Sequence, residues 1–365
     1  MKYFSILIKP ASSLCNMRCK YCFYADVADN RQVPSYGVMQ EETAKALIDR
    51  VFDYLQPPAT VSFAFQGGEP TLAGLEFFRR FTEYAAQRAN GRYELQYSIQ
   101  TNGLLIDEDW CSLFSQYRFL VGISLDAEPS IHDFCRVDAQ GKGTWNRVRQ
   151  AIRLLDHAGV PYNVLSVITK QMAQHPQKVF AAYRKNNIGF VQLIPCLQPL
   201  EGGTPGPYDL TPRLYAAFLK QFFVLWYNSL RAGYYISVRQ FDNLVRMLQG
   251  HPPEQCGMMG RCTPQFVVEA DGGVYPCDFY VLDQYRCGNI LTQDVESIAR
   301  SGAMADFVQQ TPPPGPLCAA CRVKGLCGGG CKRYRAFYNQ EAGYCPYQDF
   351  LYASVDQLAD VARMV

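Results

Sequence analysis

The chain has 365 residues, of which 48% are hydrophobic and 19% are charged, and its formal net charge at pH 7 is +2. This composition is typical of a globular protein and excludes a disordered or fibrous chain. A net charge so close to zero gives no reason to expect a nucleic acid or an anionic membrane as partner.

The N-terminal segment and the apolar runs predict a cytoplasmic protein. Residues 1–14 contain a short apolar run without a small-residue cleavage site, so they do not have the pattern of a signal peptide. We find no apolar stretch approaching the ~18 residues that a membrane-spanning helix needs. The run around Phe222 is interrupted by Lys220 and Gln221.

Apolar, β-branched and aromatic runs alternate with segments of helical periodicity over the first 200 residues or so. The predicted strands are 4–8, 61–65, 93–100, 119–125, 162–168 and 190–194. The predicted helices include 41–55, 75–88, 145–157 and 177–185. Six such units imply parallel strands joined by crossover helices, and near-continuous apolar strands indicate burial on both faces. The pattern favours an α/β fold with a partial (β/α)6 TIM-like barrel, and a doubly wound sheet is the alternative.

The pattern changes in the second half of the chain. Residues 198–212 are rich in Gly and Pro and predict a loop, and an amphipathic helix is expected over 213–231. After Pro252, short strands, turns and clustered cysteines replace the β–α units. We therefore expect a barrel domain over 1–235 and a cysteine-rich domain over 236–365.

Cysteine is unusually frequent, with 15 residues. Because no export signal is evident, a reducing compartment favours metal or catalytic use over disulfides. Cys111, Cys135, Cys196 and Cys287 fit no motif, and we expect most of them to be buried as small hydrophobic residues.

Three cysteines follow the first predicted strand in a C-x3-C-x2-C arrangement: Cys15, Cys19 and Cys22. A closed [4Fe–4S] cluster takes four cysteines, and no fourth one follows nearby. A set of three leaves one iron open to a substrate, as catalytic zinc sites leave one position open. Structural zinc with a distant fourth ligand is the alternative.

Three consecutive strands end in polar or Gly-rich turns. The sequence Gln66-Gly67-Gly68-Glu69-Pro70 follows the second predicted strand, at the end where barrel active sites are built. Paired glycines allow a backbone to approach a ligand closely. The motifs QTNG at 100–103 and SLD at 124–126 end the next two strands. The alternative for each is a plain turn or cap.

A second group of eight cysteines suffices to close two [4Fe–4S] clusters with no vacancy. Multiple zinc sites are the alternative. A run of three glycines lies inside this group, where clusters demand tight turns. The eight residues are Cys256, Cys262, Cys277, Cys318, Cys321, Cys327, Cys331 and Cys345.

The pattern C-x3-C-x-Y-C-F resembles the radical S-adenosylmethionine (SAM) superfamily. The resemblance implies that the open iron binds SAM, that the GGEP turn holds SAM's amino group, and that Ser124 helps to bind it. Tyr24 and Gln66 are expected beside the same cavity. The cofactor-binding residues implied in this way are Tyr24, Gln66, Gly67, Gly68, Glu69 and Ser124.

The C-terminal layout resembles the SPASM auxiliary-cluster domain of peptide-modifying radical SAM enzymes. That resemblance assigns one cluster to Cys256, Cys262, Cys277 and Cys331. It assigns the other to Cys318, Cys321, Cys327 and Cys345. In all, three [4Fe–4S] clusters and SAM are expected as cofactors.

The strings FAFQGGEPTLAGLEFF (63–78) and CDFYVLD (277–283), with LIKPASS (7–13) and others, extend a resemblance to anaerobic sulfatase-maturating enzymes over nearly the whole chain. This implies oxidation of a Cys or Ser side chain in a nascent sulfatase to Cα-formylglycine without dioxygen, with Asp278 as general base.

The same resemblance implies two partners. One is a sulfatase polypeptide with a (Cys or Ser)-x-Pro-x-Arg motif, and the other is a reduced flavodoxin or ferredoxin-type donor. The alternatives are another SPASM-type radical SAM peptide maturase, such as a thioether-forming enzyme, or a non-catalytic electron carrier.

Overall fold

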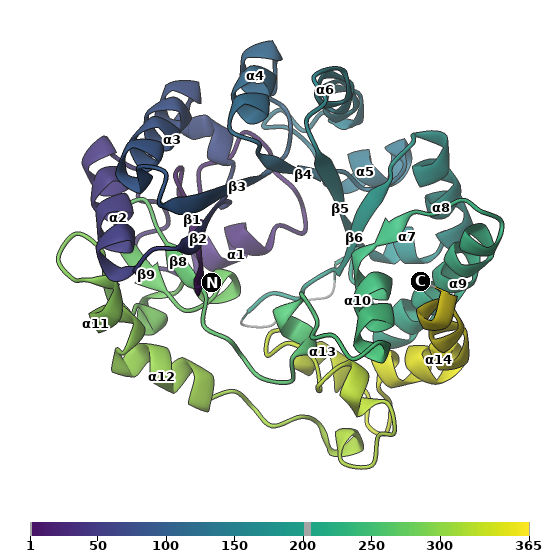
Figure 1. The fold of residues 1–365 in the computed structure, drawn as a ribbon. Coiled ribbons are helices and arrows are strands. Elements are labelled where there is room, and N and C mark those ends of the chain that lie inside the picture. Colours follow the sequence, from purple (N-terminus) through teal and green to yellow (C-terminus); the bar gives the residue numbers. More distant parts are fainter. Residues whose placement is uncertain (1, 201–205, 365) are drawn as a thin grey trace. The chain divides into compact units, whose positions relative to one another are not determined.

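The computed structural model describes residues 2–200 and 206–364, and the chain divides into two compact units (Figure 1). The first unit comprises Met1–Ser124, Arg136–Tyr162 and Pro264–Gln309, and the second comprises Leu125–Cys135, Asn163–Thr263 and Gln310–Val365. The predicted loop 198–212 lies partly outside the described residues, at 201–205. The predicted domain boundary near residue 235 stays a prediction.

The strands of the first unit follow the order β10-β9-β8-β1-β2-β3-β4. The pairs β1–β2, β2–β3, β3–β4 and β1–β8 are parallel, whereas β9 is antiparallel to both β8 and β10. Pairing of β8 with β1 joins residues 264–309 to the N-terminal strands. The strands are β1 Lys2–Ile8, β2 Ala59–Phe65, β3 Tyr93–Thr101, β4 Leu120–Ser124, β8 Phe266–Val268, β9 Gly273–Tyr275 and β10 Gly288–Asn289.

Helices α2 and α3 cover one face of these strands (Figure 1). In β2 the buried rings of Phe63 and Phe65 contact Phe78 and Phe81 of α3. The helices of this unit are α1 Phe23–Asp29, α2 Glu41–Tyr54, α3 Leu75–Ala89, α4 Glu108–Gln116, α6 Trp145–His157, α11 Val295–Ala299 and α12 Gly302–Gln309. Short 3-10 helices are η1 Pro70–Ala73, η3 Asp278–Tyr280 and η4 Asp283–Tyr285.

The second unit combines three parallel strands with a group of helices, in which α14 packs against α9 and α10 (Figure 1). Its strands are β5 Tyr162–Ile168, β6 Phe190–Pro195 and β7 Ser237–Val238. Its α-helices are α5 Pro129–Cys135, α7 Lys170–Ala173, α8 Pro176–Lys185, α9 Pro212–Arg231, α10 Arg239–Leu248, α13 Arg335–Tyr338 and α14 Pro346–Met364. Its 3-10 helices are η2 Cys256–Met258, η5 Pro316–Cys318 and η6 Lys324–Leu326.

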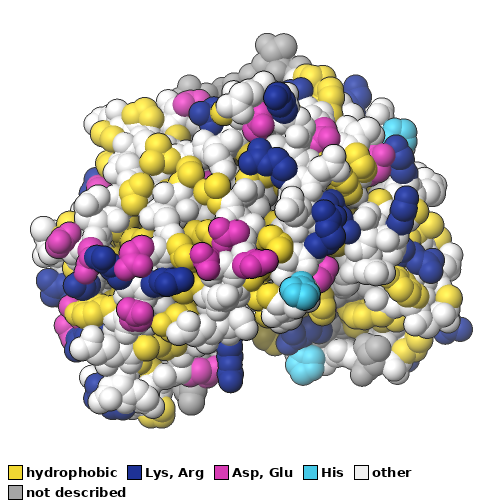
Figure 2. Space-filling view, turned by 90° about the horizontal axis from the view of Figure 1, so that it is seen from above, with side chains coloured by type: hydrophobic (Ala, Val, Ile, Leu, Met, Phe, Trp, Pro, Cys, Tyr) yellow, Lys and Arg dark blue, Asp and Glu magenta, His cyan; other side chains and the backbone are white. Residues whose placement is uncertain are grey.

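The predicted α/β class is confirmed. The six predicted strands are β1 to β6, and the five predicted helices are α2, α3, α6, α8 and α9. Within the described part of the chain, no helix combines the length and the hydropathy that crossing a bilayer requires. On the face seen in Figure 2, acidic and basic side chains are interspersed, in keeping with the small net charge.

Candidate active site

The register of the first unit's sheet aligns the carboxyl ends of its central strands. Ile8, the last residue of β1, is paired with Phe65 of β2 and with Val268 of β8. The residues that follow are Lys9, Gln66 and Glu269, so three polar side chains leave the sheet at one edge. The GGEP turn and the cysteine loop begin at the same edge, as predicted for an active site of this fold.

The first three cysteines lie on a short loop that leads into α1. Cys22 is the N-cap residue of α1, and its backbone N–H donates to the carbonyl of Cys19 at 3.2 Å. Burial raises the pKa of the Cys15 thiol to about 11; the N–H of Met17 opposes this shift, whereas Glu69 and Cys22 add to it. A thiol of this kind ionises when a cation binds it. Three thiols on one short loop are suitable ligands for a metal centre.

Gly67 and Gly68 pack against the segment that leads to Cys15. The N–H of Gly68 donates to the carbonyl of Ser12 at 2.8 Å, and the N–H of Glu69 donates to that of Leu14 at 2.7 Å. A Cβ on Gly68 would lie 2.2 Å from the Leu14 carbonyl oxygen, and one on Gly67 would lie 2.9 Å from that of Ser12. These glycines are required because two backbone segments meet here.

The Glu69 side chain is buried and connects the second strand to the third. Its carboxylate accepts from the backbone N–H and hydroxyl of Thr71, from the Thr101 hydroxyl at 2.7 Å and from the Asn102 N–H at 2.7 Å. Burial raises the pKa of Glu69, and these donors oppose the shift. Both carboxylate oxygens are thus engaged by the protein's own groups.

Asn102 extends this connection to the cysteine loop. Its side-chain amide donates to the Oδ1 of Asn16 at 2.7 Å and approaches the Cys15 sulfur at 3.9 Å, while its own Oδ1 accepts from the N–H of Leu104. The sequence placed QTNG at this edge but gave no sign of the contact with Asn16. The third strand therefore helps to hold the loop that carries Cys15.

Asp278 lies in η3, immediately after Cys277, and is 8% exposed. One carboxylate oxygen is 2.5 Å from the Nζ of Lys9, and the other accepts from the Nε2 of Gln66 at 2.6 Å. The predicted residues Asp278 and Gln66 are thus brought together, whereas Lys9 was missed. The sequence did show a lysine directly after an apolar predicted strand, and that position could have identified Lys9.

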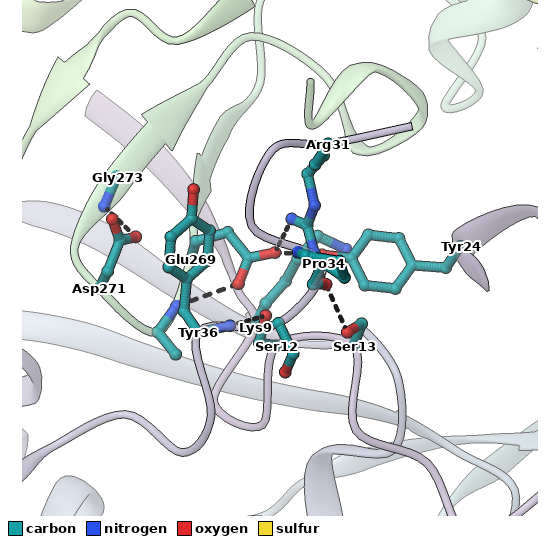
Figure 3. Close-up of polar contacts among 12 residues, drawn as sticks. Lys9, Ser12, Ser13, Tyr24, Arg31, Pro34, Tyr36, Glu269, Asp271 and Gly273 are labelled. Carbon is teal, nitrogen blue, oxygen red and sulfur yellow. Dashed lines mark hydrogen bonds and ion pairs between the residues drawn. The ribbon is translucent and has the colours of Figure 1, made fainter. Parts of the chain in front are cut away.

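Tyr24 belongs to a buried polar group with Arg31 and Glu269 (Figure 3). The Tyr24 hydroxyl donates to the Oε1 of Glu269, and Arg31 donates to the same oxygen at 2.7 Å. The Nζ of Lys9 lies 3.8 Å from the centre of the Tyr24 ring. Burial raises the pKa of Tyr24 well above its ordinary value, and Glu269 adds to the shift. The Tyr24 hydroxyl is therefore already hydrogen-bonded within the protein. Neither Arg31 nor Glu269 was identified from the sequence.

Ser124 is the last residue of β4 and is half-buried. Its hydroxyl oxygen accepts from the side-chain amide of Gln100, at the end of the neighbouring strand, at 3.2 Å. The two predicted strand-end motifs are therefore in contact, and a SAM contact by Ser124 stays a prediction.

Four cysteines of the second unit line one small hollow: Cys318, Cys321, Cys327 and Cys345. Burial raises the pKa of the Cys327 thiol to about 11, and the other three cysteines add to the shift. The N–H of Gly329 donates to the Cys327 sulfur at 3.4 Å. This set is the one that the SPASM resemblance assigned to a single cluster.

A further group forms around Cys331. Burial raises the pKa of its thiol, and the proximity of Cys256 and Cys262 contributes to the shift. A Cβ on Gly257 would lie 3.1 Å from the Cβ of Cys331, and one on Gly328 would lie 2.3 Å from the backbone of Gly260. Glycine thus allows these two backbone segments to come close together. Cys331 lies near Cys256 and Cys262, which the SPASM resemblance assigned to the same cluster.

The remaining cysteines are Cys277 and the four that fit no motif. Cys277, the fourth predicted member of the Cys331 group, belongs to the first unit. Cys111, Cys135, Cys196 and Cys287 are buried, as expected. Among residues 2–200 and 206–364, no three His, Cys, Asp or Glu side chains are grouped closely enough to hold a single metal ion.

Comparisons with known proteins identify the family. Residues 10–179 match the radical SAM superfamily, and residues 256–322 match SPASM, an iron-sulfur cluster-binding domain. The chain is 40% identical over 367 residues to a cysteine-type anaerobic sulfatase-maturating enzyme of Clostridium perfringens, covering 99% of both chains. The chain belongs to the anaerobic sulfatase-maturating enzymes. A second cysteine-type relative, from Clostridium novyi, is 41% identical over 91% of this chain and 89% of its own.

Solved structures confirm the predicted radical SAM partial barrel with its C-terminal SPASM domain. The structure described as native anSMEcpe with bound AdoMet superimposes with a TM-score of 0.92 at 39% identity, covering 99% of this chain and 100% of the other. A serine-type sulfatase-maturating enzyme of Bacteroides thetaiotaomicron is more distant, with 27% identity over 95% of this chain and 90% of its own. This chain is therefore a radical SAM oxidoreductase with [4Fe–4S] clusters.

The contact between Gly68 and the cysteine loop yields a prediction. In Gly68→Ala the new methyl group collides with the Leu14 backbone, so the loop carrying Cys15 must move. We expect the reconstituted protein to lose about four irons, those of one [4Fe–4S] cluster, and to keep the rest. Iron and sulfide analysis after anaerobic reconstitution measures this.

The matched control is Gly302→Ala in α12, because a Cβ there meets nothing within 4 Å. Its iron content should equal that of the parent protein. Full iron content in Gly68→Ala would contradict the role given to this contact.

Proposed function

We propose that this chain oxidises a cysteine in a sulfatase polypeptide to Cα-formylglycine without dioxygen. The observation that carries the proposal is the Asp278 carboxylate, held by Lys9 and Gln66 next to Cys277. Cysteine is the proposed target because the relatives at 40–41% identity are cysteine-type enzymes, whereas serine-type relatives are only 27–29% identical. Solved structures of anSMEcpe with bound peptides support a peptide substrate.

The cofactors supply the radical and the electron acceptor. When bound, SAM and the cluster at Cys15, Cys19 and Cys22 provide a 5′-deoxyadenosyl radical that removes a hydrogen atom from the substrate Cβ, and an auxiliary cluster accepts one electron. Once the thiol proton has also passed to a base, the substrate would be a thioaldehyde, which water would hydrolyse to the aldehyde with release of hydrogen sulfide.

Asp278 is the proposed general base for the substrate thiol. Each carboxylate oxygen has two lone pairs, so the oxygens bound by Lys9 and Gln66 can each accept one more proton donor. The S–H bond of the substrate breaks, and the proton passes to a carboxylate oxygen of Asp278. Such a base must lie within hydrogen-bond reach of its proton, and its orientation is therefore part of its function.

The metal ligands are proposed residue by residue. Cys15, Cys19 and Cys22 hold the SAM-binding cluster. The cysteines that line the common hollow hold one auxiliary cluster: Cys318, Cys321, Cys327 and Cys345. Cys256, Cys262 and Cys331 hold the other, with Cys277 as the fourth ligand.

The SAM contacts are proposed for the turn and strand ends of the first unit. Gly67, Gly68 and Ser124 offer backbone and hydroxyl groups at the edge where the cysteine loop begins. The side-chain oxygens of Glu69 are hydrogen-bonded to Thr101 and Asn102, and the Tyr24 hydroxyl is hydrogen-bonded to Glu269. Glu69 and Tyr24 therefore contribute to SAM binding by holding the surrounding residues in place. Gln66 contributes through Asp278.

The remaining partners follow from the same proposal. The substrate carries a (Cys or Ser)-x-Pro-x-Arg motif, and its arginine is recognised by a carboxylate. A reduced flavodoxin or ferredoxin-type protein supplies the electron for SAM cleavage. We place the enzyme in the cytoplasm.

Peptide modification tests the reaction. A short sulfatase peptide with a cysteine in the motif, incubated anaerobically with reductant and SAM, should gain formylglycine at that cysteine, as detected by mass spectrometry. The matched control peptide has alanine at the target position and should remain unchanged. Appearance of a thioether in place of the aldehyde would identify a different peptide maturase.

Asp278→Asn tests the base. The amide keeps the size of the side chain but does not accept the proton, so formylglycine formation should fall about 10²–10⁴-fold. SAM cleavage, measured as 5′-deoxyadenosine, should remain detectable because the cysteine loop is unchanged. Normal product formation in this variant would remove Asp278 from the reaction.

The triple variant with Cys15, Cys19 and Cys22 changed to Ala tests the assignment of the SAM-binding cluster. It should lose SAM cleavage and retain about eight irons, those of two [4Fe–4S] clusters. The readouts are 5′-deoxyadenosine and iron content. Retained SAM cleavage would show that SAM is activated elsewhere.

A further inference from the structure

Lys9 is a fully buried lysine at the carboxyl end of β1. Its ammonium group contacts the Asp278 carboxylate at 2.5 Å and lies 3.8 Å from the centre of the Tyr24 ring. A buried ammonium is unfavourable unless an anion or several acceptors compensate for the lost water. Asp278 supplies that anion.

The backbone of Lys9 is fixed on two sides. Its N–H donates to the carbonyl of Val268 at 2.8 Å, and its carbonyl accepts from the N–H of Ser12 at 3.1 Å. Its side chain runs beside Gly67, where an added Cβ would lie 3.3 Å from the Lys9 Cβ. The ammonium group is thus presented by a segment with little freedom to shift.

The orientation of the Asp278 carboxylate depends on two donors. Lys9 binds Oδ1 and Gln66 binds Oδ2, and these donors follow the adjacent strands β1 and β2. Asp278 is contributed by a segment 269 positions away from Lys9 in the sequence. Loss of either donor would release one oxygen and allow the carboxylate to rotate.

A second buried ion pair in the same region does not contact Asp278. Arg31 binds Glu269 at 2.7 Å, and both side chains are fully buried (Figure 3). Each buried cation therefore has its own carboxylate. Removal of Arg31 also takes a cation from beside the Tyr24 ring, but it leaves both donors on Asp278.

We propose that Lys9 is a positioning residue for the proton-transfer step, and that it holds the Asp278 carboxylate in the orientation that takes the proton from the substrate thiol. This inference rests on the proposed function. Lys9 itself exchanges no proton in the step: the proton moves from sulfur to Asp278, and the ammonium group stays on the same carboxylate oxygen.

Lys9→Met tests the inference, because methionine keeps most of the apolar length of the side chain and removes the charged end. SAM cleavage should persist, while formylglycine formed per 5′-deoxyadenosine should fall about 10–100-fold, as expected when a catalytic group is misplaced. The KM for the peptide should change less than about threefold, because Lys9 contacts Asp278 and not the peptide.

Arg31→Met is the matched control. It removes the other buried cation of the region and should leave the product ratio within about twofold of the parent value. Both variants are assayed below their unfolding temperatures and at matched iron content. An unchanged ratio in Lys9→Met, or an equal fall in both variants, would overturn the inference.

The double variant Lys9→Met, Asp278→Asn tests the inference even if Lys9→Met alone fails to fold. It removes both charges of the buried ion pair, so no buried charge is left without a partner. If Lys9 acts through Asp278, the double variant should have the same product ratio as Asp278→Asn alone. A further tenfold fall would show that Lys9 acts elsewhere.

The proposed function and this inference fail in different ways. If the parent protein cleaves SAM but forms no formylglycine, the proposed function is wrong. If the parent forms formylglycine and Lys9→Met does so with the same ratio, only the role of Lys9 is wrong.

Discussion

The site depends on the pairing of β1 with two strands from distant parts of the sequence. Ile8 is level with Phe65 on one side and with Val268 on the other. Since side chains alternate between the faces of a sheet, a slip of one residue would reverse the direction of every side chain in the slipped strand. The buried rings of Phe63 and Phe65 oppose such a slip, because it would separate them from Phe78 and Phe81 of α3. Packing on one face of the sheet therefore fixes the positions of the polar residues at its edge.

The cost of burying carboxylates at this edge of the sheet is offset in two ways. Glu69 is surrounded by neutral donors, and its contacts join the turn after β2 to the end of β3. Asp278 and Glu269 each have a buried cation, Lys9 and Arg31. Buried ion pairs are often no more stable than apolar replacements of the same volume, so stability alone is a weak reason to keep them. The Lys9–Asp278 pair is better explained by the need to orient the carboxylate that is proposed as the base.

Strands and helices with clear periodicity were predictable from the sequence, because local patterns determine them. The cysteine motifs, the GGEP turn and Asp278 were identifiable in the same way, from short strings and a family resemblance. Arg31–Glu269 and Lys9–Asp278 were not, because their partners are 238 and 269 positions apart and no local pattern encodes such a pairing. The packing role of Gly68 was missed for the same reason, since the Leu14 carbonyl that it contacts belongs to another strand's loop.

The central claim is that Asp278, held by Lys9 and Gln66, faces the reacting side chain. An anaerobic crystal structure of the protein with SAM and a cysteine-containing sulfatase peptide tests it most directly. The account predicts that the target sulfur lies within hydrogen-bond reach of an Asp278 oxygen, or one water molecule away, with Lys9 still bound to Oδ1. A target sulfur whose nearest basic group is another residue, with Asp278 turned away from it, would contradict the account.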